Sequence, residues 1–427
     1  MGKTIAIFGA GQSGQAARRL AQSLGQAAVL FDEGGQGDAS VFSAEAIGRF
    51  DSFVFSPGFA ADHPWRRIAA ESGRPCLSEL AYAAPHWRGQ LVGVTGTNGK
   101  TTVTRLLADA LGEVKVKDGA TLRVLAVGNI GYPLADAVLS TANQAGAYAV
   151  VEISSFQAEL SQTLQLDGLL WTNFAEDHLD RYAGMDAYFA AKAQLLGCLK
   201  RDAHCILGPS LMPWMERQGP TCQASRSVDQ ATGWRGRLHP DSVFRRFPNT
   251  ENFDLAAAWW QACGLPAEAL LHAANGFTPA PHRLALVFEC DGVRYWDDSK
   301  ATNFHAALAA VESVAAPIVW IGGGRAKGGD LGAFARAIAA KVAVAVLYGE
   351  AAQPLATALH GQSVRLVQED RFADAVRAAV DIAAVTPGAN VLLSPGFASF
   401  DQFESYRARG KSFRDLVLGL KRAREVG

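Results

Sequence analysis

Short apolar runs alternate with glycine turns and helical stretches along the whole chain, and this alternation limits the folds open to it. The first three runs are residues 4–8 (TIAIF), 27–31 (AAVLF) and 53–55 (FVF). Between the first two, Gln15 to Leu24 has the pattern of an amphipathic helix. Strands that alternate with helices in this way are typical of a parallel, doubly wound sheet. The sequence therefore predicts an α/β protein.

The alternation falls into three blocks, which we expect to be three domains. A chain of 427 residues is too long for one typical domain. The turn at residues 85–89 (PHWRG) closes the first block, and residues 277–283 (FTPAPHR) mark the second boundary. The predicted domains are a Rossmann-like domain at 1–88, a P-loop ATPase-type domain with a mostly parallel sheet at 89–280, and a Rossmann-like α/β domain at 281–427.

Composition excludes several classes of protein. Hydrophobic residues make up 49% and charged residues 19% of the chain, as expected for a globular protein with a large core. The formal net charge of -1 gives no basic field for nucleic acid or a membrane surface. The six cysteines are scattered without a CxxC pair, and no apolar stretch reaches membrane-spanning length. We therefore expect a cytoplasmic protein with reduced thiols.

The first glycine turn, residues 9–14 (GAGQSG), follows a predicted strand, and Asp32 lies near the end of the next strand. This is the layout of a dinucleotide fingerprint, because such glycines let a phosphate or sugar approach N–H groups at a helix N-terminus. The same turn can serve only to pack a helix on a strand. These residues alone leave an NAD site and a structural turn equally open.

A second glycine turn, residues 94–102 (VTGTNGKTT), ends as a phosphate-binding loop does, but Val94 stands where the usual pattern has glycine. Gly96 and Gly99 allow a tight loop before a helix whose dipole favours anions. Lys100 could then reach the β- and γ-phosphates of ATP, and Thr101 could bind Mg²⁺. The strand before and the helix after favour this interpretation over a chance glycine turn.

Three further segments contain polar residues that could take part in catalysis or could have only a structural role. Glu152 follows a predicted strand (YAVVE), at the sheet edge where ligands of α/β folds gather. Residues 176–180 (EDHLD) follow another strand, although Asp177 could simply cap a helix. Lys192 is isolated in an apolar helical stretch, where a lysine usually extends its amine to water.

Taken together, the motifs resemble those of the Mur ligases, and in particular of the members that add D-glutamate. The matching segments run in order along nearly the whole chain: GTNGKTT at 96–102, EISSFQ at 152–157, NFAEDHLDRY at 173–182 with AAK at 190–192, HR at 282–283, DDSKATN at 297–303, GGRAKGGD at 323–330 and LLSPGFASFDQF at 392–403. The resemblance explains Val94, because GTNGKT is this family's form of the loop.

The resemblance implies an ATP site with two Mg²⁺ ions. Lys100, Glu152, His178 and Lys192 would be the catalytic residues, with Lys192 carbamylated. Thr101, Glu152, His178 and the modified Lys192 would be the metal ligands. The implied ATP-binding residues are Gly96, Thr97, Asn98, Gly99, Lys100, Thr101, Thr102, Asn249, Asn252, Arg283, Asp298 and Lys300. Pro248 replaces the histidine usual just before the asparagine pair.

The resemblance also changes the interpretation of the first glycine turn, which in this family holds the uridine nucleotide of the substrate rather than NAD. Gly34 stands where relatives often have arginine or lysine, so this chain lacks a basic side chain at one phosphate or uracil contact of that site. The implied uridine-side residues are Gln12, Ser13, Asp32, Ser56 and Gly58, and Asn129 matches a position near the substrate and the nucleotide. Lys327 and Ser399 match positions that bind the carboxylates of the incoming glutamate, with Thr302 nearby, and Phe400 is a further implied substrate-binding residue.

The activity implied is an ATP-dependent ligase of peptidoglycan synthesis that joins D-glutamate to UDP-N-acetylmuramoyl-L-alanine through an acyl phosphate. A monomer that binds neither nucleic acid nor a membrane is expected. An L-glutamate-adding relative would share nearly every motif, and SPGFAS in place of the commoner SPACAS keeps it open. A folylpolyglutamate synthase-like ligase would not need the uridine site, and an NAD-binding protein explains only residues 4–32. The general base stays unassigned.

Overall fold

The structure, a computed structural model, describes residues 3–115, 119–218, 225–227 and 233–426. It divides into two compact units. The first comprises Met1–Phe174, Asp186–Arg245 and Asn249–Phe277, and the second comprises Ala175–Met185, Arg246–Pro248 and Thr278–Gly427. The first unit contains two sheets and the second contains one.

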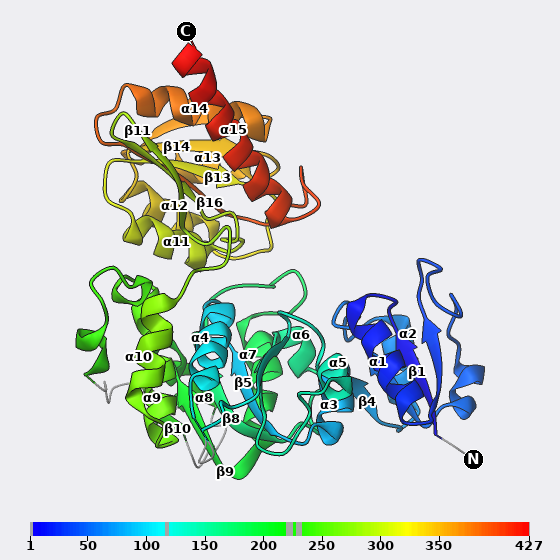
Figure 1. Cartoon of the computed structure of the whole chain (residues 1–427). Coiled ribbons are helices and arrows are strands. Elements are labelled where there is room, and N and C mark those ends of the chain that lie inside the picture. The colour runs from blue at the N-terminus through cyan, green and yellow to red at the C-terminus, as the bar shows by residue number, and fades with distance from the viewer. Residues whose placement is uncertain (1–2, 116–118, 219–224, 228–232, 427) are drawn as a thin grey trace. The chain divides into compact units, whose positions relative to one another are not determined.

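The N-terminal sheet of the first unit has the strand order β2-β1-β3-β4, with every pair parallel. Its strands are β1 (Thr4–Phe8), β2 (Ala27–Phe31), β3 (Ser52–Phe55) and β4 (Cys76–Ser78). Helices α1 (Gln12–Ser23), α2 (Pro64–Glu71) and α3 (Glu79–Ala83) accompany it (Figure 1). The predicted helix begins three residues earlier than expected, at Gln12, directly after the glycine turn.

Aromatic side chains fill the core on this sheet. The buried members are Phe8, Phe31, Phe42, Phe50, Phe53, Phe55 and Trp65. Phe8 on the central strand stacks on Phe55 with ring centroids 4.2 Å apart. A strand covered on both faces requires a continuous apolar run, and this explains why TIAIF, in the central strand β1, carries no alternation.

The central sheet of the first unit has the order β10-β9-β8-β5-β7-β6, again with every pair parallel. Its strands are β5 (Gln90–Thr95), β6 (Val124–Gly128), β7 (Tyr148–Glu152), β8 (Leu166–Trp171), β9 (Leu199–Leu207) and β10 (Ser225–Ser227). The chain passes from β7 on one side of β5 to β8 on the other. The carboxyl end of β5 is therefore a topological switch point, where ligands of open α/β sheets bind.

Helices α4 (Lys100–Gly112), α9 (Asn249–Ala262) and α10 (Ala267–Gly276) share one core beside this sheet (Figure 1). Trp259 and Trp260 of α9 are almost fully buried in it. Between residues 200 and 250, where the sequence pattern is irregular, the described elements after β9 are α8 (Met212–Gln218), β10 and short 3₁₀ turns. Shorter helices α5 (Leu134–Leu139), α6 (Ser155–Ala158) and α7 (Met185–Ala193) follow β6, β7 and β8.

The second unit has one mixed sheet of order β11-β12-β16-β13-β14-β15. Its strands are β11 (Ala285–Cys290), β12 (Val293–Asp297), β13 (Ile318–Gly323), β14 (Val344–Tyr348), β15 (Arg365–Glu369) and β16 (Asn390–Gly396). Its helices are α11 (Phe304–Ser313), α12 (Leu331–Ala339), α13 (Ala352–Leu359), α14 (Phe372–Ala384) and α15 (Tyr406–Val426). The alternation of strands and helices expected along the C-terminal part of the chain is confirmed from β13 to α15.

The sequence interpretation missed the antiparallel edge of this sheet. Strands β11 and β12 form a hairpin. Asp291 and Gly292 link them with φ angles of +52° and +75°, as a type I′ turn requires. Apart from this edge the strands are parallel, and the predicted α/β architecture with three sheets is confirmed.

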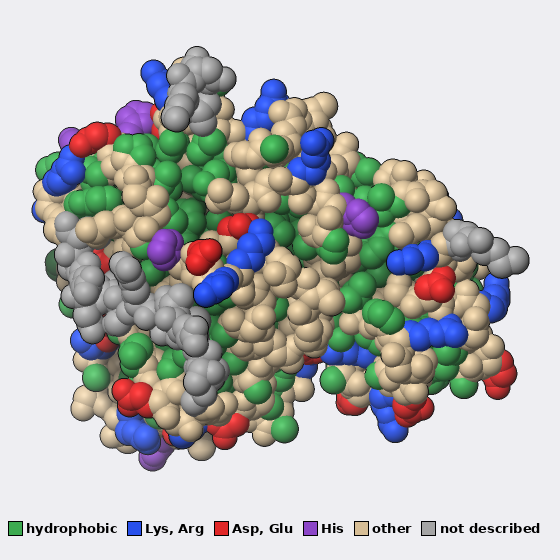
Figure 2. Space-filling view, turned by 90° about the horizontal axis from the view of Figure 1, so that it is seen from below, with side chains coloured by type: hydrophobic (Ala, Val, Ile, Leu, Met, Phe, Trp, Pro, Cys, Tyr) green, Lys and Arg blue, Asp and Glu red, His purple; other side chains and the backbone are tan. Residues whose placement is uncertain are grey.

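Two surface properties complete the description. Within the described ranges, no helix is both long enough and apolar enough to cross a membrane. On the face drawn in Figure 2, basic and acidic side chains are interspersed with apolar ones. This mixture agrees with the net charge of -1.

Candidate active site

The loop after β5 adopts a conformation that its two glycines make possible. Gly96 and Gly99 have φ angles of +141° and +81°. A Cβ atom on Gly96 would lie 1.9 Å from Thr172 Oγ1, and one on Gly99 would lie 2.2 Å from Asn252 Oδ1. Gly99 is the N-cap of α4, so the loop leads directly into a helix N-terminus. Strand, loop and helix have the arrangement that binds phosphate in nucleotide-binding proteins.

Two lysine side chains meet at one carbonyl of this loop. Lys100 Nζ donates to Gly96 O at 2.9 Å and to Thr97 O at 2.8 Å. Lys192 Nζ, from α7, also donates to Gly96 O at 2.9 Å and lies 5.1 Å from the centre of the Tyr188 ring. Lys192 is only 1% exposed, so the interpretation in which its amine extends to water is wrong.

Glu152, the last residue of β7, connects the loop to the neighbouring strand ends. Its Oε2 accepts from Thr101 Oγ1 at 2.7 Å, and its Oε1 accepts from Asn129 Nδ2 at 2.8 Å. The carboxylate is 2% exposed. Three residues predicted separately from the sequence are thus in contact at the switch point.

The donor set around Glu152 fits Mg²⁺. A hydroxyl and a carboxylate are hard oxygen ligands, and Mg²⁺ commonly takes one or two protein oxygens and completes its shell with water and phosphate. Within the described ranges, no cluster of three or more His, Cys, Asp and Glu side chains forms a metal site made of protein groups alone. Thr101 Oγ1 and the Glu152 carboxylate, 2.7 Å apart, are two oxygen ligands of the kind that Mg²⁺ takes.

Sequence reasoning missed two residues that hold the phosphate loop from the end of β8. Thr172 Oγ1 donates to Asn98 O at 2.5 Å, and Asn98 N donates to Asn173 Oδ1 at 2.9 Å. The signal available was the polar pair that directly follows the apolar run LLW. On another side of the loop, Asn252 Nδ2 donates to Asn249 Oδ1 at 3.1 Å, so the predicted asparagine pair is formed beside Gly99.

The N-terminal glycine turn is closed by Asp32. Oδ2 of Asp32 accepts from Ala10 N at 2.8 Å, and Oδ1 accepts from Gly34 N at 3.0 Å. The Ala10 N–H bond is the main reason that the pKa of Asp32 is below its ordinary value. Gln12 and Ser13 open α1 at this turn. Asp32 therefore orders the turn.

A second loop lies beside the same turn. A Cβ atom on Gly9 would lie 2.8 Å from Ser56 Oγ, so the loop that begins at Ser56 packs directly on the turn. Gly58, in that loop, is exposed. The structure thus brings all five predicted uridine-side residues to neighbouring segments at the carboxyl ends of β1, β2 and β3.

In the second unit, Asp177 organises the segment that contains His178. Asp177 Oδ2 accepts from Asn303 Nδ2 at 3.0 Å and lies 3.6 Å from His178 Nε2. Its Oδ1 lies 3.3 Å from Lys327 Nζ. These partners make Asp177 a bridge between loops rather than a helix cap. His178 has a φ angle of +56°, in the left-handed region. His178 and Lys327, predicted for the metal and glutamate sites, are thus both in contact with Asp177.

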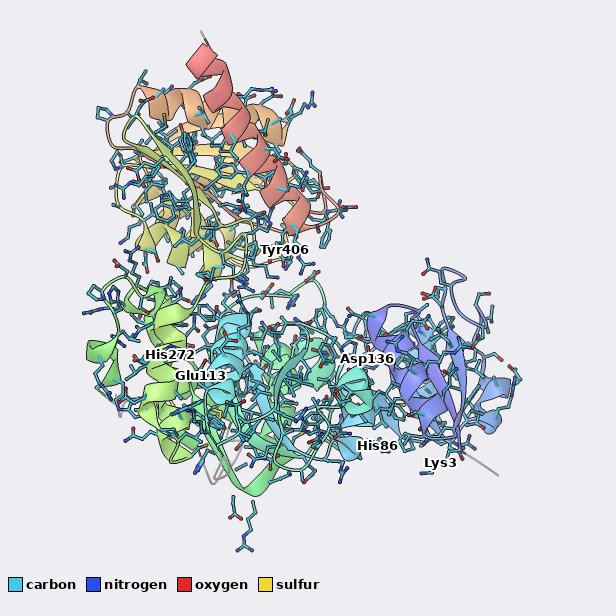
Figure 3. All side chains as sticks on the ribbon, viewed as in Figure 1. Lys3, His86, Glu113, Asp136, His272 and Tyr406 are labelled. Atoms are coloured by element: carbon cyan, nitrogen blue, oxygen red, sulfur yellow. The ribbon has the colours of Figure 1, made fainter. Side chains whose placement is uncertain are left out.

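Asp298 directly follows β12 and lies near Arg283, another predicted ATP-side residue of this unit. It accepts from Ser394 Oγ at 2.8 Å and from Leu284 N at 3.0 Å. Burial raises the pKa of Asp298 to about 7, although its hydrogen bonds and the charge of Arg283 oppose the rise. Lys300 Nζ lies 4.3 Å from the centre of the Tyr406 ring, at the start of α15 (Figure 3).

The remaining predicted residues differ in exposure. Ser399 is 2% exposed, whereas the neighbouring Phe400 is 60% exposed. Thr302 is half-buried just before Asn303, the N-cap of α11. The sequence interpretation missed Arg409, which is fully buried and donates to Ser299 O at 2.8 Å and Phe397 O at 3.1 Å. Arg409 thereby ties the segment containing Lys300 to the segment containing Ser399.

Comparison with known proteins gives a consistent picture. The model of the Mur ligase middle domain matches residues 94–231, and that of the Mur ligase glutamate ligase domain matches residues 282–397. A protein from Gloeobacter violaceus called UDP-N-acetylmuramoylalanine--D-glutamate ligase is 36% identical over 447 residues, covering 97% of this chain and 99% of its own. A protein of the same name from Sphingopyxis alaskensis is 36% identical, with 98% of each chain covered.

Solved structures share the fold at lower identity. A pseudomurein peptide ligase type C from Methanothermus fervidus has a TM-score of 0.59 at 14% identity, covering 98% of this chain and 100% of its own. A UDP-N-acetylmuramate-alanine ligase from Thermotoga maritima has a TM-score of 0.57 at 14% identity, with 100% of both chains covered. A folylpolyglutamate synthase from Mycobacterium tuberculosis has a TM-score of 0.56 at 16% identity, covering 78% of this chain and 92% of its own.

Proposed function

The chain belongs to the Mur ligase family, and from that premise we propose that it joins D-glutamate to UDP-N-acetylmuramoyl-L-alanine. It is an ATP-dependent, amide-bond-forming ligase of peptidoglycan precursor synthesis. The choice of D-glutamate and of this acceptor is supported by the names of relatives that match nearly the whole chain.

The observation that carries the proposal is the cluster at the carboxyl end of β5. Lys100, Thr101, Glu152 and Asn129 come from three strand ends and meet within hydrogen-bonding reach of one another or of the same loop. A positively charged loop beside a carboxylate–hydroxyl pair is what transfer of the γ-phosphoryl group of ATP requires. A glycine turn with only a structural role would not need two buried or half-buried lysines that donate to the same carbonyl oxygen.

In the proposed reaction, the alanyl carboxylate of the acceptor attacks the γ-phosphorus of ATP, the bond to the β-γ bridging oxygen breaks, and ADP leaves. The amine nitrogen of glutamate then attacks the acyl carbon, and inorganic phosphate leaves as the amide forms. The amine loses a proton in this step, and the group that accepts it is unassigned. Lys100 would leave the carbonyls of Gly96 and Thr97 and stabilise the charge on the phosphoryl oxygens.

Thr101 and Glu152 would hold a Mg²⁺ ion, which when bound offsets charge on the phosphoryl oxygens. Asn129 would hold the Glu152 carboxylate in the orientation that the ion needs. A second Mg²⁺ site with His178, and carbamylation of Lys192, stay predictions of the motif resemblance. The position of Lys192 supports the modification, because its buried amine lies at the carbonyl of Gly96 in the phosphate loop, where a carboxylate-like group would be close to the proposed metal ligands.

Substrate roles follow from the positions within each unit. The glycine turn and the loop beginning at Ser56 would bind the uridine nucleotide, with Asp32 ordering the turn. The residues that would bind glutamate are Lys327, Thr302, Ser399 and Phe400, and those that would bind ATP from this unit are Arg283, Asp298 and Lys300.

The reaction would run in the cytoplasm, where its ATP is made. The monomeric state stays a prediction that light scattering can measure.

The decisive experiment measures release of inorganic phosphate with ATP, Mg²⁺ and UDP-N-acetylmuramoyl-L-alanine, comparing D- with L-glutamate. We expect phosphate release that depends on D-glutamate, together with formation of the amide product. Omitting the acceptor is the control for ATP hydrolysis. Turnover with L-glutamate but not with D-glutamate would show that L-glutamate is the amino acid substrate. No turnover with either amino acid would refute the proposed acceptor.

A further inference from the structure

A buried arginine joins the two sheets of the first unit. Arg66 lies on α2, beside the N-terminal sheet, and its Nη1 donates to Phe59 O at 3.0 Å. The same nitrogen donates to Glu159 Oε2 at 2.5 Å, on the segment after β7 of the central sheet. The two side chains of this ion pair are only 10% and 9% exposed. A buried, charge-assisted contact of this kind fixes the groups it joins.

On the N-terminal side, Arg66 holds residues 56–59, here called the uridine-side loop. Phe59 is its last residue, and the loop packs on the glycine turn. A Cβ atom on Gly9 would lie 2.8 Å from Ser56 Oγ and 3.2 Å from the Phe59 ring. Because Ser56 and Phe59 lie so close to Gly9, a displacement of Phe59 would change the packing of the uridine-side loop on the glycine turn.

On the central side, Arg66 holds the segment that carries Glu152. Glu159 is the C-cap of α6, and Ser154 is its N-cap. A capping box rigidifies this short helix. In it, Ser154 N donates to Gln157 Oε1 at 3.0 Å, and Gln157 N donates to Ser154 Oγ at 3.2 Å. Ile153 N also donates to Val94 O at 2.8 Å. A shift of Glu159 would therefore be transmitted to Glu152.

We propose that Arg66 is a positioning residue that couples the uridine-side loop to the Glu152 segment. Binding of a uridine nucleotide would immobilise the loop and, through Arg66 and Glu159, hold Glu152 in the orientation that binds Mg²⁺. The inference rests on the proposed function, because it takes residues 56–59 as part of a uridine nucleotide site. By linkage, a change on the central side must then alter uridine nucleotide affinity.

The test compares Arg66→Gln, Glu159→Gln and the double variant, with Arg66→Lys as the conservative change. Arg74→Gln is the matched control, because Arg74 donates to Ile47 O and Phe50 O, and both acceptors lie in the N-terminal sheet region. The dissociation constant of UDP is measured by calorimetry. The Mg²⁺ concentration that gives half-maximal turnover is measured at saturating ATP, acceptor and glutamate.

Arg66→Gln and Glu159→Gln should each weaken UDP binding on the order of tenfold and raise the Mg²⁺ midpoint, while Arg66→Lys restores part of both. The double variant should be no worse than Arg66→Gln alone, because the same contact is lost. Arg74→Gln should lower the melting temperature without moving either quantity. Unchanged UDP affinity in Glu159→Gln, or fully additive effects, would overturn the coupling while leaving the proposed function intact. Absence of UDP binding by the unaltered protein would overturn both.

Discussion

Replacing Asn129 by alanine tests how the candidate active site holds its metal ligand. The amide of Asn129 donates to Glu152 Oε1 at 2.8 Å, and the Glu152 carboxylate is 2% exposed. A hydrogen bond to a charged group contributes about 1.5–3 kcal/mol. Because Asn129 itself is exposed, water can replace part of the lost bond, and we expect about 1–2 kcal/mol.

That free energy corresponds to roughly a five- to thirtyfold change in an equilibrium constant. In Asn129→Ala, the Mg²⁺ concentration for half-maximal phosphate release should rise by about this factor, and turnover at saturating Mg²⁺ should fall less. Asn143→Ala is the matched control. Asn143 Nδ2 donates at 2.9 Å to His86 O and Val138 O, away from Glu152. A Mg²⁺ dependence that is the same in both variants would refute the role given to Asn129.

Four further predictions address single residues. Lys100→Ala should abolish turnover but keep UDP binding, because the phosphate loop and the predicted uridine site are on different sheets. UDP binding is measured by calorimetry, and near-normal ATP-dependent activity would contradict the phosphate-loop assignment. Lys192→Ala should be nearly inactive, and bicarbonate or a short carboxylic acid should restore part of the rate if a carbamate acts there; full activity without additive would count against it. Asp32→Ala should raise the KM for the UDP-sugar acceptor about tenfold, because the glycine turn loses the carboxylate that accepts from Ala10 N, and should leave the KM for ATP nearly unchanged. Tight binding of NAD without binding of UDP would instead support a dinucleotide site. Burial raises the pKa of Asp298 from 3.8 to about 7, so the folded state holds a proton that the unfolded chain releases, and this contribution to stability is lost as pH rises between those values. Asp298→Asn should therefore flatten the fall in melting temperature over that range, and an unaltered slope would show that Asp298 does not cause it.

The parts of the fold that depend on neighbouring residues were predictable from the sequence. Apolar runs marked the parallel strands, and the loop from Gly96 to Gly99 was identified as a turn before a helix because glycine and helix-start signals are local. The hairpin at Asp291 and Gly292 was not predicted, although an Asp-Gly pair between two apolar runs is a local signal for a type I′ turn.

Contacts between distant segments were not predictable in the same way. Thr172 and Asn98 are 74 residues apart, and Arg66 and Glu159 are 93 apart. Only the order of strands in the sheets brings such pairs together, and neither composition nor periodicity carries that information. The role of Lys192 had the same limitation: the helical pattern around it gave no sign that its amine reaches the carbonyl of Gly96.

The space around Gly96 has a consequence for inhibitor resistance. A Cβ atom there would lie 1.9 Å from Thr172 Oγ1, the atom that donates to Asn98 O. Any replacement of Gly96 would displace that hydroxyl and strain a residue whose φ angle is +141°. A compound that binds the backbone of this loop would therefore leave the protein few single substitutions by which to escape it, since a change that excludes the compound would also deform the loop.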